Sequence, residues 1–200
     1  MSTAKQNKWV ITMAFLWILI AAPLGCKEKS EDYAPSGDTV QVAAGSLEKA
    51  LGLWSQGEQD TAMYELLDVN WKVPPTFSES SVLSLKQKEF SALSPDEQLL
   101  KQQEIYDAAT AIMELGQYVY DSGQADLGAE KKYMVAERKF NAVYNFAEFL
   151  LSDPESLEAL QKSGIGLKRT ALTGMVDLYK QWDQPEKLRV AQEALDKLKD

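Results

Sequence analysis

The stretch Ala129–Leu151 reads AEKKYMVAERKFNAVYNFAEFLL, and its apolar residues recur in alternating steps of four and three. Steps of this size place side chains on one face of an α-helix. The residues of this seam are Ala129, Tyr133, Ala136, Phe140, Val143, Ala147 and Leu150. The remaining faces carry mixed charges, as a solvated surface does. The stretch therefore predicts one amphipathic helix over roughly residues 124–151.

We expect this helix to pack against the helix before it in the same chain. The preceding sequence opens with Ser94-Pro95-Asp96-Glu97, a capping box with proline at the first helical position. From there a helix is predicted to Asp121, with Ser122-Gly123 as its stop. A turn of about three residues then favours packing within the molecule over a long coiled coil between molecules, which is the alternative. Two adjacent apolar rows on the first helix predict neighbours on two sides; they are Ile105, Ala108, Ile112, Leu115, Val119 and Tyr106, Ala109, Met113, Gly116, Tyr120.

Helix signals also recur on both sides of this pair. Ser46 is the expected N-cap of a helix that stops at Gly57, and a second helix containing Ala62 is expected to end at Val73–Pro75. A short helix around Phe90 is predicted within residues 76–94. After Leu151, the sequence predicts helices over 153–162 and 172–182, separated by a break at 163–166 (SGIG), and a last helix that opens at Pro185.

The predicted fold class is all-α, built of antiparallel helical hairpins. The first hairpin resembles a tetratricopeptide repeat in the spacing of Ala50, Leu53, Gly57, Ala62, Leu66 and Pro74. A second match contains Leu115, Gly116, Gly123, Ala129, Tyr133 and Ala136, and a third runs from Met175 through Tyr179 and Asp183 to Leu188 and Leu195. The resemblance implies a tetratricopeptide-like α-solenoid. An irregular helical bundle is the alternative, because small residues at helix crossings occur in bundles too.

The N-terminal residues have the pattern of a signal peptide. Lys5 and Lys8 precede an almost wholly apolar run, Trp9–Ala22, and no charged residue follows it before Cys26, the only cysteine. Gly25-Cys26 after such a run resembles the lipobox of bacterial lipoproteins. The resemblance implies cleavage before Cys26 and attachment of lipid, with acyl chains such as palmitate, to that cysteine. Pro23 and Leu24 depart from the family's usual residues, so an uncleaved membrane anchor, ordinary secretion and a misread start remain alternatives.

The expected organisation has three parts. Residues 1–25 form the signal peptide, residues 26–45 the lipidated cysteine with a flexible tether, and residues 46–200 the helical domain. The segment after Cys26 contains clustered charges, Pro35 and Gly37, which suits a tether. The predicted location is the cell envelope, on a membrane. Lys27 is not the aspartate that retains enteric lipoproteins in the inner membrane, so the resemblance favours the outer membrane.

Composition narrows the function classes. There is no histidine, which excludes histidine-dependent triads and zinc sites of Cys/His type. Of 21 basic residues two precede Cys26, and all 30 acidic residues follow it, which leaves a net charge of −11 that disfavours nucleic-acid binding. Residues 163–170 (SGIGLKRT) lack the glycine spacing of a phosphate-binding loop. We expect no catalytic residues, no cofactor and no metal ion.

The expected function is therefore that of a membrane-tethered scaffold or adaptor, which binds an unidentified partner protein through its helical hairpins. One alternative is a small-ligand carrier or enzyme that uses carboxylates and tyrosines in a helical pocket. Another is a structural envelope protein. The aromatic residues between Tyr133 and Phe149, and Trp54, Trp71 and Trp182 near helix ends, are expected to be core rather than binding residues.

Overall fold

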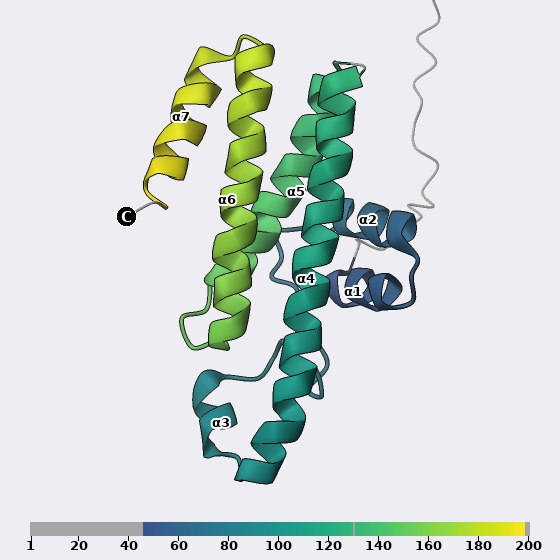
Figure 1. Ribbon diagram of the computed structural model, residues 1–200, viewed down its shortest axis with the longest axis vertical. Coiled ribbons are helices and arrows are strands. Elements are labelled where there is room, and N and C mark those ends of the chain that lie inside the picture. Colours follow the sequence, from purple (N-terminus) through teal and green to yellow (C-terminus); the bar gives the residue numbers. More distant parts are fainter. Residues whose placement is uncertain (1–45, 130, 199–200) are drawn as a thin grey trace, which may run out of the picture. The chain divides into compact units, whose positions relative to one another are not determined.

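The computed structural model describes residues 46–129 and 131–198. All regular secondary structure in these ranges is α-helical, and they contain no strand (Figure 1). The prediction of an all-α fold is confirmed. The helices are α1 (Leu47–Ser55), α2 (Gln59–Leu67), α3 (Gln87–Ala92), α4 (Pro95–Ala129), α5 (Tyr133–Leu151), α6 (Glu158–Gln181) and α7 (Pro185–Asp196). The predicted signal peptide, Cys26 and the tether lie outside the described residues.

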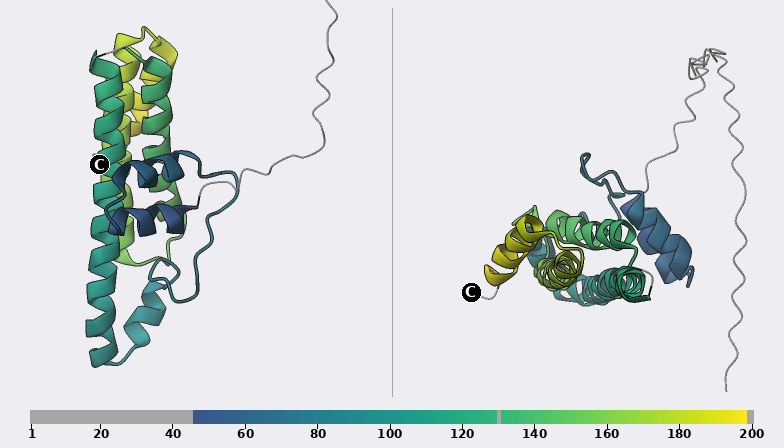
Figure 2. Two further views of the ribbon diagram at one scale, coloured as in Figure 1. Left: turned by 90° about the vertical axis from the view of Figure 1, so that its right-hand side faces the viewer. Right: turned by 90° about the horizontal axis from the view of Figure 1, so that it is seen from above.

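Helices α4, α5 and α6 lie side by side with alternating direction (Figures 1 and 2). The predicted seam of α5 faces this interface: Phe140, Val143 and Ala147 are completely buried. Packing within the molecule is thus confirmed, and α4 has neighbours on two sides as expected, since both α5 and α6 contact it. Burial of the seam's aromatic and aliphatic side chains supplies the main driving force for this packing.

The boundary between α4 and α5 differs from the prediction. Helix α4 continues through Ser122-Gly123 to Ala129, and α5 begins at Tyr133, so Ala129 belongs to α4 rather than to α5. Gly123 is needed for close packing instead of a turn, because a Cβ there would lie 2.7 Å from Cε1 of Phe140 on α5. The chain reverses where Lys131 adopts a positive φ of 49°.

The predicted break at residues 163–166 is also wrong. These residues lie inside α6, which begins at Glu158 rather than at Asp153-Pro154 and continues to Gln181. Gly164 lets α6 approach α5, since a Cβ there would lie 3.0 Å from Cγ of Leu151. Ser163 donates a hydrogen bond of 3.1 Å to the Ala159 carbonyl one turn earlier, which suits a helix interior. Where α6 crosses a neighbouring helix, only a small residue leaves room for close packing. The free energy gained by this packing outweighs the low helix propensity of glycine and serine.

Helices α1 and α2 form a short hairpin against α4. Ser46 caps α1, and Gly57 ends it with a φ of 82°, both as predicted. In the second match to the tetratricopeptide pattern, Gly123 lies within α4. The indole N–H of Trp54 donates a hydrogen bond of 3.2 Å to Glu114 of α4, which fixes the hairpin on that helix. Helix α2 ends at Leu67, earlier than the predicted stop at Val73–Pro75.

The segment 68–86 then crosses from the α1–α2 hairpin to the corner between α5 and α6. Phe77 packs against Phe149 with ring centroids 5.7 Å apart, and the Gln87 amide donates to the Glu155 carbonyl at 2.9 Å. The short helix around Phe90 is α3, the capping box at Ser94–Glu97 opens α4, and Pro185 opens α7, all as predicted. None of the helices in the described ranges is long and apolar enough to cross a membrane.

Candidate functional site

The side of α5 opposite its buried seam is open. Met134, Glu137, Arg138, Asn141 and Asn145 lie along it at helical spacing, and we call these five residues the outer face of α5. The side chain of Met134 is 75% exposed. A row of this kind arises because the seam residues turn inward every three or four positions, so the residues between them face away from the core.

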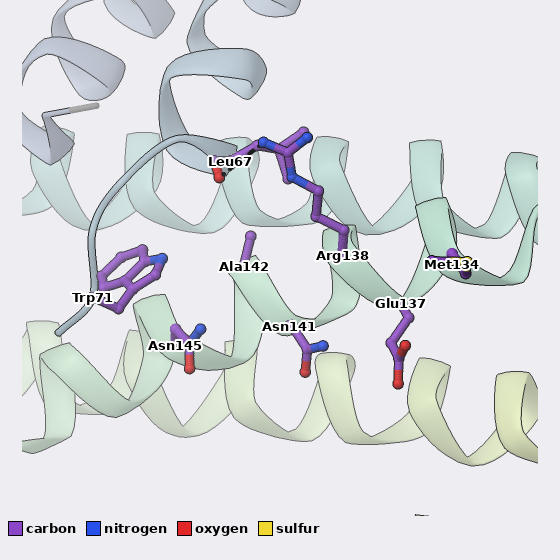
Figure 3. Close-up of a pocket in the computed structure, with 8 residues that line it drawn as sticks. All are labelled: Leu67, Trp71, Met134, Glu137, Arg138, Asn141, Ala142 and Asn145. Carbon is purple, nitrogen blue, oxygen red and sulfur yellow. Dashed lines mark hydrogen bonds between the residues drawn. The ribbon is translucent and has the colours of Figure 1, made fainter. Parts of the chain in front are cut away.

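A pocket of about 330 Å³ lies between this outer face and the end of α2 (Figure 3). Leu67 and Trp71 form its far wall, and Ala142 lies at its base. Trp71 is held in place by two aromatic contacts, with ring centroids 6.2 Å from Phe146 and 6.4 Å from Phe149. We call this the α2-side pocket.

A second pocket, of about 450 Å³, lies on the other side of α5 and is bounded by α6 and α7. Its lining is mainly apolar and aromatic, and Val190 of α7 remains 58% exposed at its edge. Asn141 lines both this α7-side pocket and the α2-side pocket. The outer face of α5 is therefore a ridge with a partly apolar hollow on each side. The other residues of the α7-side pocket are Tyr144, Leu172, Met175, Tyr179, Glu186, Lys187, Ala191 and Ala194.

The charged groups of the ridge are all paired. Arg138 donates to Asp68 at 2.7 Å, beyond the end of α2. On the α7 side, Glu137 accepts hydrogen bonds from Lys187 at 2.7 Å and from the Tyr179 hydroxyl at 2.9 Å. Burial raises the pKa of the Tyr179 phenol above its ordinary value, and the adjacent Glu137 carboxylate raises that pKa further. The ridge consequently offers a ligand little uncompensated charge.

The two asparagines of the ridge are different. Neither the Asn141 amide nor the Asn145 amide makes a hydrogen bond to any other residue in the described part of the chain. Asn141 is exposed and Asn145 is half-buried. Each amide combines a carbonyl acceptor with two N–H donors, so each can pair with a group that both donates and accepts. In Figure 3 the two amides project from α5 in a similar direction, one helical turn apart.

The structure places some of the residues singled out in the sequence in the core and others in the two pockets. Cys26 lies outside the described residues. The expectation that the aromatic residues of α5 belong to the core holds for Phe140 and Phe146, which are fully buried, whereas Tyr144 also lines the α7-side pocket. Trp182 stacks on Tyr133 at 5.6 Å, while Trp71 lines the α2-side pocket.

One further stretch discussed in the sequence, residues 163–170, is helical. It lies within α6, where Lys168 pairs with Glu148 at 2.5 Å. In the described ranges, no three histidine, cysteine, aspartate or glutamate side chains come together in a way that could hold a metal ion.

The sequence reasoning missed Asn141 and Asn145. The available signal was their spacing of four on the polar face of the helix, but asparagines at such positions are usually just solvated. Comparison with known proteins adds no relative: no family model, no curated protein and no solved structure matches this chain.

Proposed function

We propose that the protein is a scaffold that holds a segment of a partner protein on the outer face of α5, close to a membrane. The observation that carries this proposal is the ridge itself, with a partly apolar hollow on each side and exposed Met134 and Val190 at its margins. Exposed apolar side chains beside partly apolar pockets are typical of protein interaction sites. Trp71 and the two tyrosines of the α7-side pocket are residue types that often anchor such interfaces.

The hairpin architecture supports a scaffold role. Ala50 of α1 and Ala62 of α2 are completely buried where the two helices meet, which is the contact that a tetratricopeptide-like hairpin needs. Stacked hairpins of that kind present surfaces to segments of partner proteins. The proposed scaffold is therefore tetratricopeptide-like in its first hairpin.

The membrane attachment rests on the sequence around Cys26. A lipid on that cysteine, followed by the 18 residues Lys27–Ala44, would tether the helical domain at a root-mean-square distance of roughly 23 Å for a flexible chain. Two or three acyl chains hold a protein stably on a bilayer. We place the protein in the cell envelope, with the outer membrane favoured. Metabolic labelling with a palmitate analogue should mark the wild-type chain, and labelling that persists in Cys26→Ala would contradict lipidation there.

Partner binding is tested by photo-crosslinking in the native host. A photoreactive phenylalanine analogue is placed at Met134 in one strain and at Val190 in another, because both side chains are exposed at the margins of the ridge. We expect both positions to crosslink to the same protein. Leu100 of α4 is the matched control, since it is also an exposed apolar residue, 71% accessible, but lies on another helix. No adduct from Met134 or Val190, or the same adduct from Leu100, would refute the proposed function.

A further inference from the structure

We infer that the outer face of α5 binds an uncharged peptide segment in an extended conformation, whose main chain pairs with Asn141 and Asn145. This inference rests on the proposed function and names the kind of segment that is bound. It starts from the two asparagine amides, which have no hydrogen-bond partner among the described residues. An amide side chain can accept from a main-chain N–H and donate to a main-chain carbonyl at the same time.

The spacing of the two amides fits an extended chain. Residues four apart on an α-helix are separated by about 6 Å along the axis. Alternate residues of a β-strand are separated by about 6.7 Å, and their N–H and C=O groups point to the same edge of the strand. These two spacings differ by less than about 1 Å, and small rotations of the asparagine side chains can compensate for this difference over two contacts. Asn141 can therefore pair with one peptide residue and Asn145 with the residue two positions away.

This pairing also directs the peptide's side chains. A strand that turns one edge toward α5 projects its side chains alternately to the left and right of the helix. The two paired residues would then project into one pocket, and the residue between them into the other. Both pockets are available at this point, because Asn141 lines the α2-side pocket of about 330 Å³ and the α7-side pocket of about 450 Å³. Trp71 offers an aromatic wall on the first side and Tyr144 on the second.

The pairing of the charged groups on the ridge favours an uncharged peptide. Arg138 is already paired with Asp68, and Glu137 with Lys187, so a charged peptide side chain would gain no free counter-charge here. Burying such a charge without a partner is unfavourable. A peptide with apolar side chains pays no such cost of burying a charge, and its main-chain groups provide hydrogen-bond partners for the two amides. A helical ligand fits less well, because its main-chain groups are already hydrogen-bonded to one another.

The test uses the full chain in detergent and a phage-displayed library of random linear ten-residue peptides. Selected peptides are synthesised with blocked termini, and their affinities are measured by fluorescence anisotropy. We expect selection of peptides with an uncharged, apolar centre. The double variant Asn141→Ala/Asn145→Ala should weaken binding at least about tenfold, since the two hydrogen bonds that each asparagine makes to the peptide are removed. Alanine is the better helix former, so the variant should keep its fold, as circular dichroism can verify.

Two controls separate main-chain pairing from other modes of binding. Gln103→Ala removes an exposed amide from α4, where it donates to Asp107 at 2.8 Å, and should leave the affinity unchanged. Peptides N-methylated at the pairing residues lose the N–H donors and should bind at least about tenfold more weakly. Failure to enrich any linear peptide, enrichment of charged or helical peptides, or affinities unaffected by the double variant would overturn the inference. Crosslinks from Met134 and Val190 would in those cases still support the proposed function, so the two failures are distinguishable.

Discussion

Lys139 of α5 pairs with Asp126 of α4 at 2.5 Å in a position where only 11% of the lysine side chain and 19% of the aspartate side chain are exposed. The same ammonium donates a hydrogen bond of 2.7 Å to the Ser122 hydroxyl. This pair links α4, close to its C-terminal end, to α5. An ion pair so far removed from water loses much of its hydration, so its partners depend on each other.

We expect Asp126→Ala to lower the free energy of unfolding by about 3 kcal/mol, because it leaves the Lys139 ammonium buried without its counter-charge. The double variant Asp126→Leu/Lys139→Met should recover most of that loss, since it buries apolar groups of similar size instead. Urea denaturation followed by circular dichroism measures both. If the single and the double variant are equally destabilised, the loss comes from packing and not from the unpaired charge.

The sequence predicted the helices better than it predicted their ends. Periodicity on α5 and the capping box before α4 depend on neighbours within a few turns, so they are visible in the sequence alone. The two false helix breaks, at Gly123 and at residues 163–166, have one cause. Glycine lowers helix propensity locally, but a neighbouring helix can require it, and nothing local reveals that neighbour. Phe140, which lies 17 residues from Gly123 in the sequence, provides that requirement.

Gly174 of α6 offers a direct test of this explanation. A Cβ at this position would lie 2.8 Å from Cε2 of Tyr120 and 2.9 Å from Cε1 of Phe140, and aromatic rings cannot bend away. We expect Gly174→Ala to lower the free energy of unfolding by about 1–3 kcal/mol, as overpacking does. The matched control is Gly52→Ala in α1, where nothing besides its chain neighbours and the backbone of its own helix lies within 4 Å of the new methyl group. That variant should gain about 0.5–1 kcal/mol from helix propensity. Equal effects at the two positions in urea denaturation would contradict the packing explanation.

The candidate site was less predictable than the fold. Its two pockets join residues that are far apart in the sequence, such as Trp71 with Asn145 and Asn141 with Val190. Nothing in the local pattern distinguishes Asn141 from a solvated polar residue, because its importance comes from what lies on either side of α5. The predicted N-terminal attachment signal is the opposite case. A lipobox is read by enzymes as a short linear segment, so the prediction for Cys26 needs no fold.

The phenol of Tyr179 predicts how stability depends on alkaline pH. Burial and the Glu137 carboxylate raise its pKa above the ordinary value of about 10, so the unfolded chain releases this proton at a lower pH than the folded chain. The stabilisation is fully present below about pH 10 and is lost as the pH rises toward the pKa of the folded state. Tyr179→Phe should therefore reduce the decline of the free energy of unfolding between about pH 9.5 and 11.5. Urea titrations across this range measure the decline, and an unchanged slope in the variant would assign it to other tyrosines, among which burial also raises the pKa of Tyr120 and Tyr144.

The first turns of α4 should be the least protected part of that helix. No residue between Pro95 and Glu104 is buried, and Leu99 and Leu100 are 70% and 71% exposed. In Figure 1 this end of α4 extends past α6 and has only the short helix α3 beside it. Local opening there breaks few apolar contacts. Backbone amides near Gln103 should therefore exchange hydrogen for deuterium faster than those of residues 112–119, where the side chains of Ile112, Leu115 and Val119 are fully buried.

The capping box limits this opening. The Ser94 amide donates to Glu97 at 2.9 Å, and the Glu97 amide donates to the Ser94 hydroxyl at 3.4 Å. Hydrogen bonds from Ser94 also hold the pKa of the Glu97 carboxyl below its usual value, so the cap should weaken as the pH falls through that lowered pKa. We expect Ser94→Ala to accelerate exchange in the first two turns of α4 by about fivefold, the equivalent of about 1 kcal/mol for a lost N-cap, and to leave residues 112–119 unchanged. Hydrogen exchange with mass spectrometry resolves the two regions, and equal acceleration in both would mean that α4 opens as one unit.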